Sequence, residues 1–155
     1  MYKVIGIGEY NISNDQTDII KTYALSSCVA VTAYCPRMKA AGMVHVALPE
    51  YTGNDVPPNE GYYASTGIVA LIDKLCMKYS CKKDDLIIRI YGGANSTNKN
   101  DVFRIGEKNI SAVMEALSGL GLKIDKAEIG GFVSRTIELD VATGQVKMLT
   151  QPFNF

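Results

Sequence analysis

Two apolar segments of strand length, residues 29–34 and 41–48, are separated only by a short turn-forming sequence at residues 36–39. Strands joined by so tight a turn are usually antiparallel neighbours in one sheet. Residues near the start of the first strand then face residues near the end of the second. This pairing constrains the fold of the whole chain, and it also decides which side chains can meet.

Other parts of the chain carry strand and helix patterns. Apolar residues recur at helical spacing over residues 62–78 and near 106–118, which predicts two helices. The remaining expected strands are bounded by glycine and turn-forming residues, and they cover residues 2–10, 19–23, 86–91, 122–129, 133–140 and 145–149.

Two helices cannot cover both faces of so many strands. We therefore expect the helices to pack on one sheet whose other face packs against a second sheet. This is an α/β fold of the α+β type, a three-layer α/β/β sandwich. The length of 155 residues suits one compact domain spanning residues 1–155.

Composition excludes several classes of protein. Lysine plus arginine and aspartate plus glutamate both number 16, so the chain lacks the basic character of a protein that binds nucleic acid. The first residues contain no long apolar region of the kind found in signal peptides. No apolar stretch approaches the roughly 20 residues that span a bilayer. We expect a cytoplasmic location without direct membrane insertion.

The cysteine pattern does not favour a metal site. The four cysteines form no C-x-x-C motif, and in a reducing compartment we expect them to remain thiols. A zinc site of three cysteines and one histidine is arithmetically possible. Such sites usually use close-set ligand pairs, however, and the nearest pair here is Cys76 and Cys81, at an expected helix end. We expect no metal, with Cys35, Cys76 and Cys81 as core or boundary residues.

Cys28 and His45 are the candidate catalytic pair. Cys28 stands at the start of the first paired strand, and His45, the single histidine, lies inside the second. A thiol is a strong nucleophile once it is deprotonated, and imidazole titrates near physiological pH, so together they suit hydrolysis through a Cys–His pair. The alternative is that Cys28 is a small buried strand residue and His45 a hydrogen-bonded core histidine.

Three further residues belong to this hypothesis. Thr22 is most simply a strand residue, but its hydroxyl also suits the task of holding an imidazole in one tautomer. Ser26 and Ser27 precede Cys28 and suit an exposed turn whose backbone N–H groups serve as an oxyanion hole or contact the substrate. The sequence Gly6-Ile7-Gly8 lacks the later glycine of a dinucleotide fingerprint, so we expect no cofactor.

Several segments together resemble a known family. They cover nearly the whole chain, in order and spacing, and comprise residues 4–10, Thr22, 28–31, 42–49, 92–94, 105–109, 130–131 with Arg135, and 143–144. This arrangement resembles CheD, the chemoreceptor glutamine deamidase family of bacterial and archaeal chemotaxis.

The resemblance implies a fold, a reaction and partners. The fold would be an α/β/β sandwich similar to the catalytic domain of cytotoxic necrotising factor toxins. Cys28 would be the nucleophile, His45 the general base and Thr22 the orienting residue of a protein-glutamine glutaminase. It would act through a thioester on the cytoplasmic helices of methyl-accepting chemotaxis proteins, without a cofactor. Some members also hydrolyse receptor methyl esters, and members bind CheC, a phosphatase.

One departure from the family pattern stands beside the nucleophile. The family commonly has Gly-Leu-Gly-Ser-Cys, where this chain has Ala24-Leu25-Ser26-Ser27-Cys28. If the second glycine requires a positive φ, Ser26 carries a strain of roughly 1 kcal/mol. This motivates an alternative function, an adaptor with little catalysis that binds CheC or receptor helices. Deamidation of a different protein is a third possibility.

Overall fold

The structure is a computed structural model that describes residues 1–57, 59–95 and 103–153. Within these residues the chain forms nine strands, two α-helices and two short 3-10 helices. The helices are α1 (Ala64–Tyr79) and α2 (Ile105–Gly119), and the 3-10 helices are η1 (Glu60–Tyr62) and η2 (Lys83–Asp85).

The strands form two mixed sheets. The five-stranded sheet has the order β2 (Tyr10–Ser13), β5 (Ala40–Val46), β4 (Val29–Cys35), β6 (Ile87–Gly92), β7 (Ile124–Ile129). The four-stranded sheet has the order β1 (Tyr2–Val4), β3 (Ile19–Leu25), β8 (Val133–Asp140), β9 (Val146–Pro152). The pairs β1–β3 and β6–β7 are parallel, and the other pairs are antiparallel.

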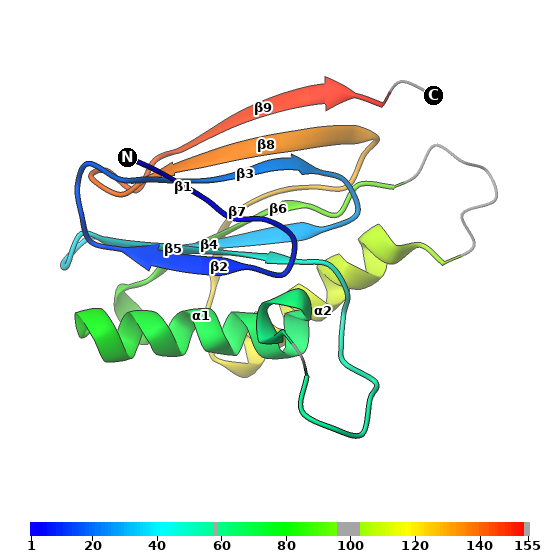
Figure 1. Cartoon of the computed structure of the whole chain (residues 1–155), viewed down its shortest axis with the longest axis horizontal. Coiled ribbons are helices and arrows are strands. Elements are labelled where there is room, and N and C mark those ends of the chain that lie inside the picture. The colour runs from blue at the N-terminus through cyan, green and yellow to red at the C-terminus, as the bar shows by residue number, and fades with distance from the viewer. Residues whose placement is uncertain (58, 96–102, 154–155) are drawn as a thin grey trace.

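The two sheets and the helices stack as three layers. Figure 1 shows the four-stranded sheet on top, the five-stranded sheet in the middle and both helices below it. The α/β/β sandwich expected from the sequence is therefore confirmed, as is the antiparallel pairing of the two central strands, β4 and β5. Within the described residues, no helix is long and apolar enough to cross a membrane.

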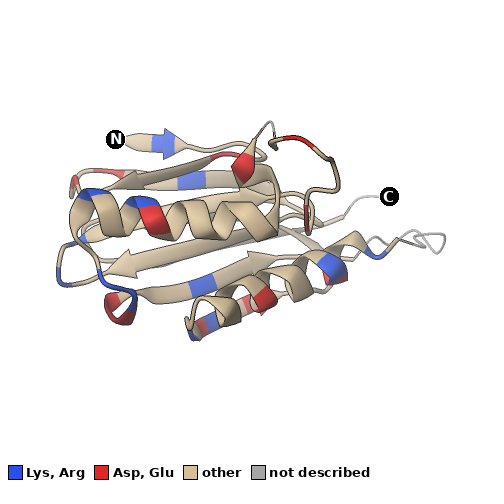
Figure 2. Ribbon diagram, turned by 90° about the horizontal axis from the view of Figure 1, so that it is seen from below, with Lys and Arg blue, Asp and Glu red and all other residues tan. Residues whose placement is uncertain are grey.

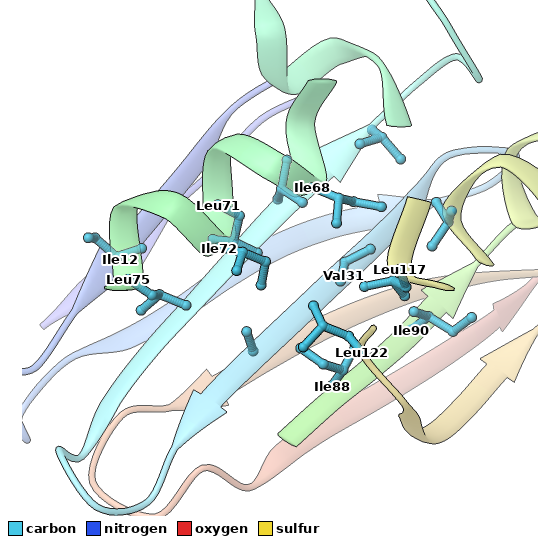
Figure 3. Close-up of a cluster of buried hydrophobic side chains, with 14 of the residues drawn as sticks. Ile12, Val31, Ile68, Leu71, Ile72, Leu75, Ile88, Ile90, Leu117 and Leu122 are labelled. Atoms are coloured by element: carbon cyan, nitrogen blue, oxygen red, sulfur yellow. The ribbon is translucent and has the colours of Figure 1, made fainter. Parts of the chain in front are cut away.

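The first of two cores lies between the helices and the five-stranded sheet (Figure 3). The buried face of α1 repeats every three or four residues, which is why this segment is helical. That face consists of Ile68, Leu71, Ile72 and Leu75. Each fully buried side chain of this kind stabilises the fold by about 1.5–3 kcal/mol.

The second core lies between the two sheets. Successive side chains of β4 alternate between the cores, so Val29 and Val31 face the helices while Ala30 faces the four-stranded sheet. From the opposite sheet, Ile20 and Leu139 contribute to this second core. Because both of its faces are covered, every residue of β4 is buried, and polar groups on this strand and on β5 are enclosed as well.

The prediction of a single strand over residues 2–10 is wrong. The segment contains β1, which belongs to the four-stranded sheet, and the start of β2, which belongs to the five-stranded sheet. Between them the chain crosses from one layer to the other through Gly8, whose φ is +80°. A Cβ on Gly8 would lie 2.8 Å from an atom of the Tyr62 ring, so the crossing also requires glycine for space.

Candidate active site

The two sheets bring Thr22 and His45 together. Thr22 lies on β3 and His45 on β5, so each layer supplies one of the two side chains. Their exposed fractions are 0% and 3%, and the Thr22 Oγ1 lies 2.7 Å from the His45 Nδ1. The hydrogen bond expected between these residues is therefore present in the second core.

The partners of Thr22 favour one tautomer of His45. The Thr22 Oγ1 also lies 2.9 Å from the carbonyl oxygen of Ile5, which can only accept a hydrogen bond. The hydroxyl therefore donates to Ile5 and accepts from the Nδ1–H of His45. In the neutral ring this leaves Nε2 with a free lone pair, and no described residue donates a hydrogen bond to it. Nε2 is thus available to accept a proton.

Cys28 lies on the same face of the five-stranded sheet as His45. His45 is directly opposite Ala30 in the β4–β5 ladder, and Cys28 precedes Ala30 by two residues. Side chains two residues apart on a strand point to the same side, so Cys28 and His45 are diagonal neighbours. Consistent with this, Cys28 packs against the core between the sheets and is partly exposed. The Cys28 Sγ makes no hydrogen bond with the His45 Nε2, which is buried.

Burial keeps both reactive groups uncharged at neutral pH. Desolvation lowers the pKa of the His45 imidazole from 6.5 to about 4, against a smaller opposing effect of Glu9. Desolvation also raises the pKa of the Cys28 thiol, and the backbone N–H of Cys28 itself partly offsets this. The resting pair is therefore a thiol and a neutral imidazole, unlike the thiolate found in many Cys–His hydrolases.

The backbone before Cys28 is held by the chain that follows β6. The Gly93 N–H donates to the carbonyl of Cys28 at 2.8 Å, and the Ala94 N–H donates to the carbonyl of Ser26 at 2.7 Å. Gly92 has a φ of +110°, and a Cβ there would lie only 2.3 Å from the carbonyl oxygen of Cys28. The paired glycines therefore allow a close approach to the nucleophile.

The backbone strain near the nucleophile is at Ala24 and not at Ser26. Ala24 has a φ of +51°, whereas Ser26 is absent from the positive-φ residues of the described chain. Ala24 lies in an irregularity of the β3–β8 ladder between Thr22 and Leu25, and its N–H donates to Thr136 Oγ1 at 3.0 Å. The condition for strain at Ser26, a positive φ at the second glycine position of the family pattern, is therefore not met. The bulge instead places the first glycine position, Ala24, in the left-handed region.

Sequence reasoning missed two buried polar residues next to these groups. Asn109 of α2 is fully buried and donates from Nδ2 to the carbonyls of Ser27 and Ala47. Arg135 of β8 is 6% exposed and donates to the carbonyl of Gly92 at 3.4 Å, while its Nε has no hydrogen-bond partner. For Asn109 a signal existed, because it precedes Val113 by one helical turn and so lies on the apolar stripe of its helix.

The other cysteines lie outside the candidate site. Cys35 and Cys81 are buried in the core beneath the helices, and Cys76 packs against it. Among the residues that the structure describes, no group of three or more possible ligands is suited to a metal ion. Figure 2 shows basic and acidic residues interspersed along α1 and α2.

A cavity of about 1070 Å³ lies between α1, α2 and the segment that follows His45. Its walls include Leu48, Glu50, Val69, Glu107 and Leu120, but neither Cys28 nor His45. The candidate site is therefore located by the geometry of Thr22, His45 and Cys28 and not by the size of a cavity.

The sequence of this chain is similar to those of a known protein family. The family described as "CheD chemotactic sensory transduction" matches residues 47–150. A solved structure of a Bacillus licheniformis hypothetical protein, YfiH, aligns with 77% of this chain and 49% of its own, with a TM-score of 0.47 and 13% identity.

Curated relatives extend the match to the N-terminal half. A protein of Syntrophotalea carbinolica named "Probable chemoreceptor glutamine deamidase CheD" is 43% identical over 94% of this chain and 91% of its own. A Thermotoga maritima protein named "Chemoreceptor glutamine deamidase CheD" is 36% identical over 94% of this chain and 90% of its own. A relative from Pyrococcus abyssi is 35% identical over 93% of this chain and 88% of its own. The chain belongs to the CheD family.

Proposed function

We propose that this protein hydrolyses glutamine side-chain amides to glutamate on the cytoplasmic helices of methyl-accepting chemotaxis proteins, with Cys28, His45 and Thr22 as its triad. One observation carries the proposal. The bond between the Thr22 Oγ1 and the His45 Nδ1 leaves the Nε2 of His45 as a free base on the face of the sheet that Cys28 shares. The names of the relatives support chemoreceptor glutamine as the substrate.

In the first half of the reaction, the Nε2 of His45 takes the proton of the Cys28 thiol while the sulfur attacks the carboxamide carbon. Backbone N–H groups near Ser27 and Cys28 stabilise the oxyanion that forms. His45, now an imidazolium, gives its proton to the amide nitrogen. The C–N bond breaks, ammonia leaves, and the acyl group remains on Cys28 as a thioester.

In the second half, His45 takes a proton from water, and the hydroxide attacks the thioester carbon. The C–S bond breaks, the sulfur regains the proton from His45, and glutamate is released. Throughout, the Nδ1–H of His45 remains bonded to Thr22, which fixes the orientation of the ring. Because both groups are uncharged at rest, the thiol becomes a strong nucleophile only by giving its proton to His45.

The test uses a receptor cytoplasmic fragment and peptide mass spectrometry. The wild-type protein is expected to convert specific glutamines to glutamates, and the Cys28→Ala variant is expected to lose this activity entirely. Cys76→Ala is the matched control, since it removes another partly exposed thiol, one that packs against the other core. Equal activity of the wild-type and Cys28→Ala proteins would refute the role of Cys28.

Ala24 supports a second candidate function, an adaptor that binds a CheC-type phosphatase or receptor helices with little catalysis. Ala24 takes the left-handed conformation that glycine adopts without strain, and it lies four residues before Cys28. Binding to CheC by a folded wild-type protein that leaves every glutamine of the fragment unchanged would favour this adaptor function over the enzyme.

A further inference from the structure

We propose that Asn109 is a positioning residue that fixes the Cys28 turn against the strand that carries His45; this inference rests on the proposed function. Its single amide nitrogen donates two hydrogen bonds, at 2.9 Å to the carbonyl of Ser27 and at 3.0 Å to the carbonyl of Ala47. The first acceptor directly precedes the nucleophile. The second follows His45 by two residues on the same segment.

The bond to Ser27 acts on the nucleophile through one peptide plane. The carbonyl of Ser27 and the N–H of Cys28 belong to the same planar unit, in which they point in opposite directions. Fixing the Ser27 oxygen toward α2 therefore directs the Cys28 N–H away from the helix layer. That N–H acts on the sulfur of Cys28, where it lowers the pKa of the thiol. It is also one of the proposed oxyanion donors.

The bond to Ala47 ties the same amide to the base. Ala47 continues the segment from β5, and its carbonyl is held by a side chain that comes from a different layer of the sandwich. Both acceptors would otherwise need other partners, because the Asn109 side chain is fully buried. The Oδ1 of Asn109 makes no hydrogen bond with any described residue. The hydrogen bonds of this side chain to Ser27 and Ala47 therefore both come from Nδ2.

A purely structural role would be fulfilled by any well-packed side chain at this point of α2. The matched control is therefore Val113→Ala, one turn further along the same helix, at a residue that is equally buried but packs only in the apolar core. Two test variants are Asn109→Asp, which keeps the size but replaces the donating NH₂ by oxygen, and Asn109→Ala, which removes the amide.

The first measurement is the steady-state deamidation of a receptor fragment. We expect the Asn109 variants to lower kcat by about 10- to 100-fold, the loss typical of a misplaced reacting group, while KM changes little. Val113→Ala is expected to lower Tm without this loss of kcat. A fall in kcat equal in the Asn109 and Val113 variants would mean that Asn109 acts through stability alone, and would overturn the proposal.

The second measurement needs no substrate, so it is independent of the proposed reaction. The rate of alkylation of Cys28 by iodoacetamide is followed against pH by peptide mass spectrometry, with Cys76 as the internal reference. Asn109 directs the Cys28 N–H, which lowers the pKa of the thiol, so the Asn109 variants are expected to move the midpoint of Cys28 to higher pH while the midpoint of Cys76 is unchanged. An unmoved or lower midpoint in folded Asn109 variants overturns the proposal.

The two measurements distinguish a failure of the proposed deamidation from a failure of the proposed positioning role of Asn109. A wild-type protein that deamidates nothing, together with a shifted Cys28 midpoint in the Asn109 variants, refutes the proposed function and retains the positioning role. If Asn109→Asp does not fold, Asn109→Ala supplies the same comparison. If neither folds while Val113→Ala does, Asn109 is required for folding and its positioning role is refuted.

Discussion

The hydroxyl of Thr22 decides which nitrogen of His45 carries the proton. It lies between an oxygen that can only accept and the ring nitrogen Nδ1, so it donates to Ile5 and accepts from His45. An Asp or Asn performs this task in other triads, and in the proposed triad a neutral hydroxyl would perform it without placing a carboxylate in the core. The pKa of the imidazole is low because desolvation outweighs the smaller opposing effect of Glu9.

Replacing Thr22 by valine tests this role at nearly constant volume. Thr22→Val leaves the Nδ1–H of His45 buried without an acceptor, and we expect kcat to fall by about 10- to 100-fold, the equivalent of one buried hydrogen bond to a group that becomes charged. Thr22→Ser keeps the hydroxyl and is expected to retain most of the activity. Thr32→Val is the control, because Thr32 is a buried threonine of β4 outside the site.

Two results of the Thr22 experiment would contradict this prediction. A Thr22→Val protein as active as the wild type would show that the tautomer needs no acceptor at Nδ1. Equal losses in Thr22→Val and Thr32→Val would attribute the effect to the stability of the sheets and not to the imidazole.

Individual residues divide into those that the sequence identifies and those that only the fold reveals. The placement of Cys28 and His45 on one face of the sheet was predictable because two adjoining strands carry them, and their catalytic roles stay predictions. Asn109 was missed because its function depends on two carbonyls 82 and 62 residues away in the chain. The choice between Ala24 and Ser26 as the strained residue likewise depends on a bulge, which periodicity does not report.

Among the elements, the segment at the end of β6 directly contacts the backbone of Cys28, the proposed nucleophile. Gly92 combines a φ of +110° with an approach that leaves no room for a Cβ, since the carbonyl oxygen of Cys28 would lie 2.3 Å away. The same segment carries the Gly93 N–H that bonds this carbonyl. Both contacts set the position of the turn before β4, so a shift of β6 is transmitted directly to Cys28.

We expect Gly92→Ala to lower kcat by about 10-fold or more, because the turn at Cys28 must move to admit the methyl group. Gly121→Ala is the matched control. It also places alanine at a positive φ, +72°, but no atom within 4 Å would meet its Cβ. The two variants are compared by thermal unfolding and by deamidation of the receptor fragment. Equal activity in both would mean that the contact with the Cys28 carbonyl does not position the nucleophile.

The helices and central strands were predictable because their apolar patterns are long and local. The first ten residues were not, because their division into β1 and β2 depends on pairing with β3 in one sheet and with β5 in the other. A local sequence pattern does not indicate where the chain passes from one sheet to the other. The glycines in this segment were visible, but only the packing of Gly8 against Tyr62 shows that one of them marks the crossing.

At the scale of the whole molecule, the candidate site lies between the two sheets, and this location links the protonation of His45 to stability. Thr22 belongs to one layer and His45 to the other, so their hydrogen bond forms only when the layers are stacked. The imidazole is therefore enclosed, and its protonation would bury a positive charge in the core. The unfolded chain has no such restriction and binds a proton near the ordinary pKa of 6.5.

Stability is therefore expected to decrease as the pH falls from about 6.5 to about 4. Above this range both states hold a neutral imidazole, and within it only the unfolded state is readily protonated. The shift corresponds to about 3 kcal/mol of unfolding free energy, a large fraction of the roughly 5–15 kcal/mol typical of a domain. The carboxyls with lowered pKa values, Asp15, Asp55 and Asp85, have an ordinary pKa of 3.8, so their effect on stability lies at lower pH.

Urea unfolding of the wild-type and His45→Gln proteins at several pH values between 7 and 4 measures this effect. The wild-type protein is expected to lose stability steadily across the range, whereas the variant, which has no group to protonate at this position, is expected to show a much flatter profile. Only the change with pH is compared, so any constant destabilisation by the glutamine cancels. Parallel profiles would mean that the imidazole is reached by water or by an anionic partner in the folded state, and that the seam between the sheets does not hold His45 neutral.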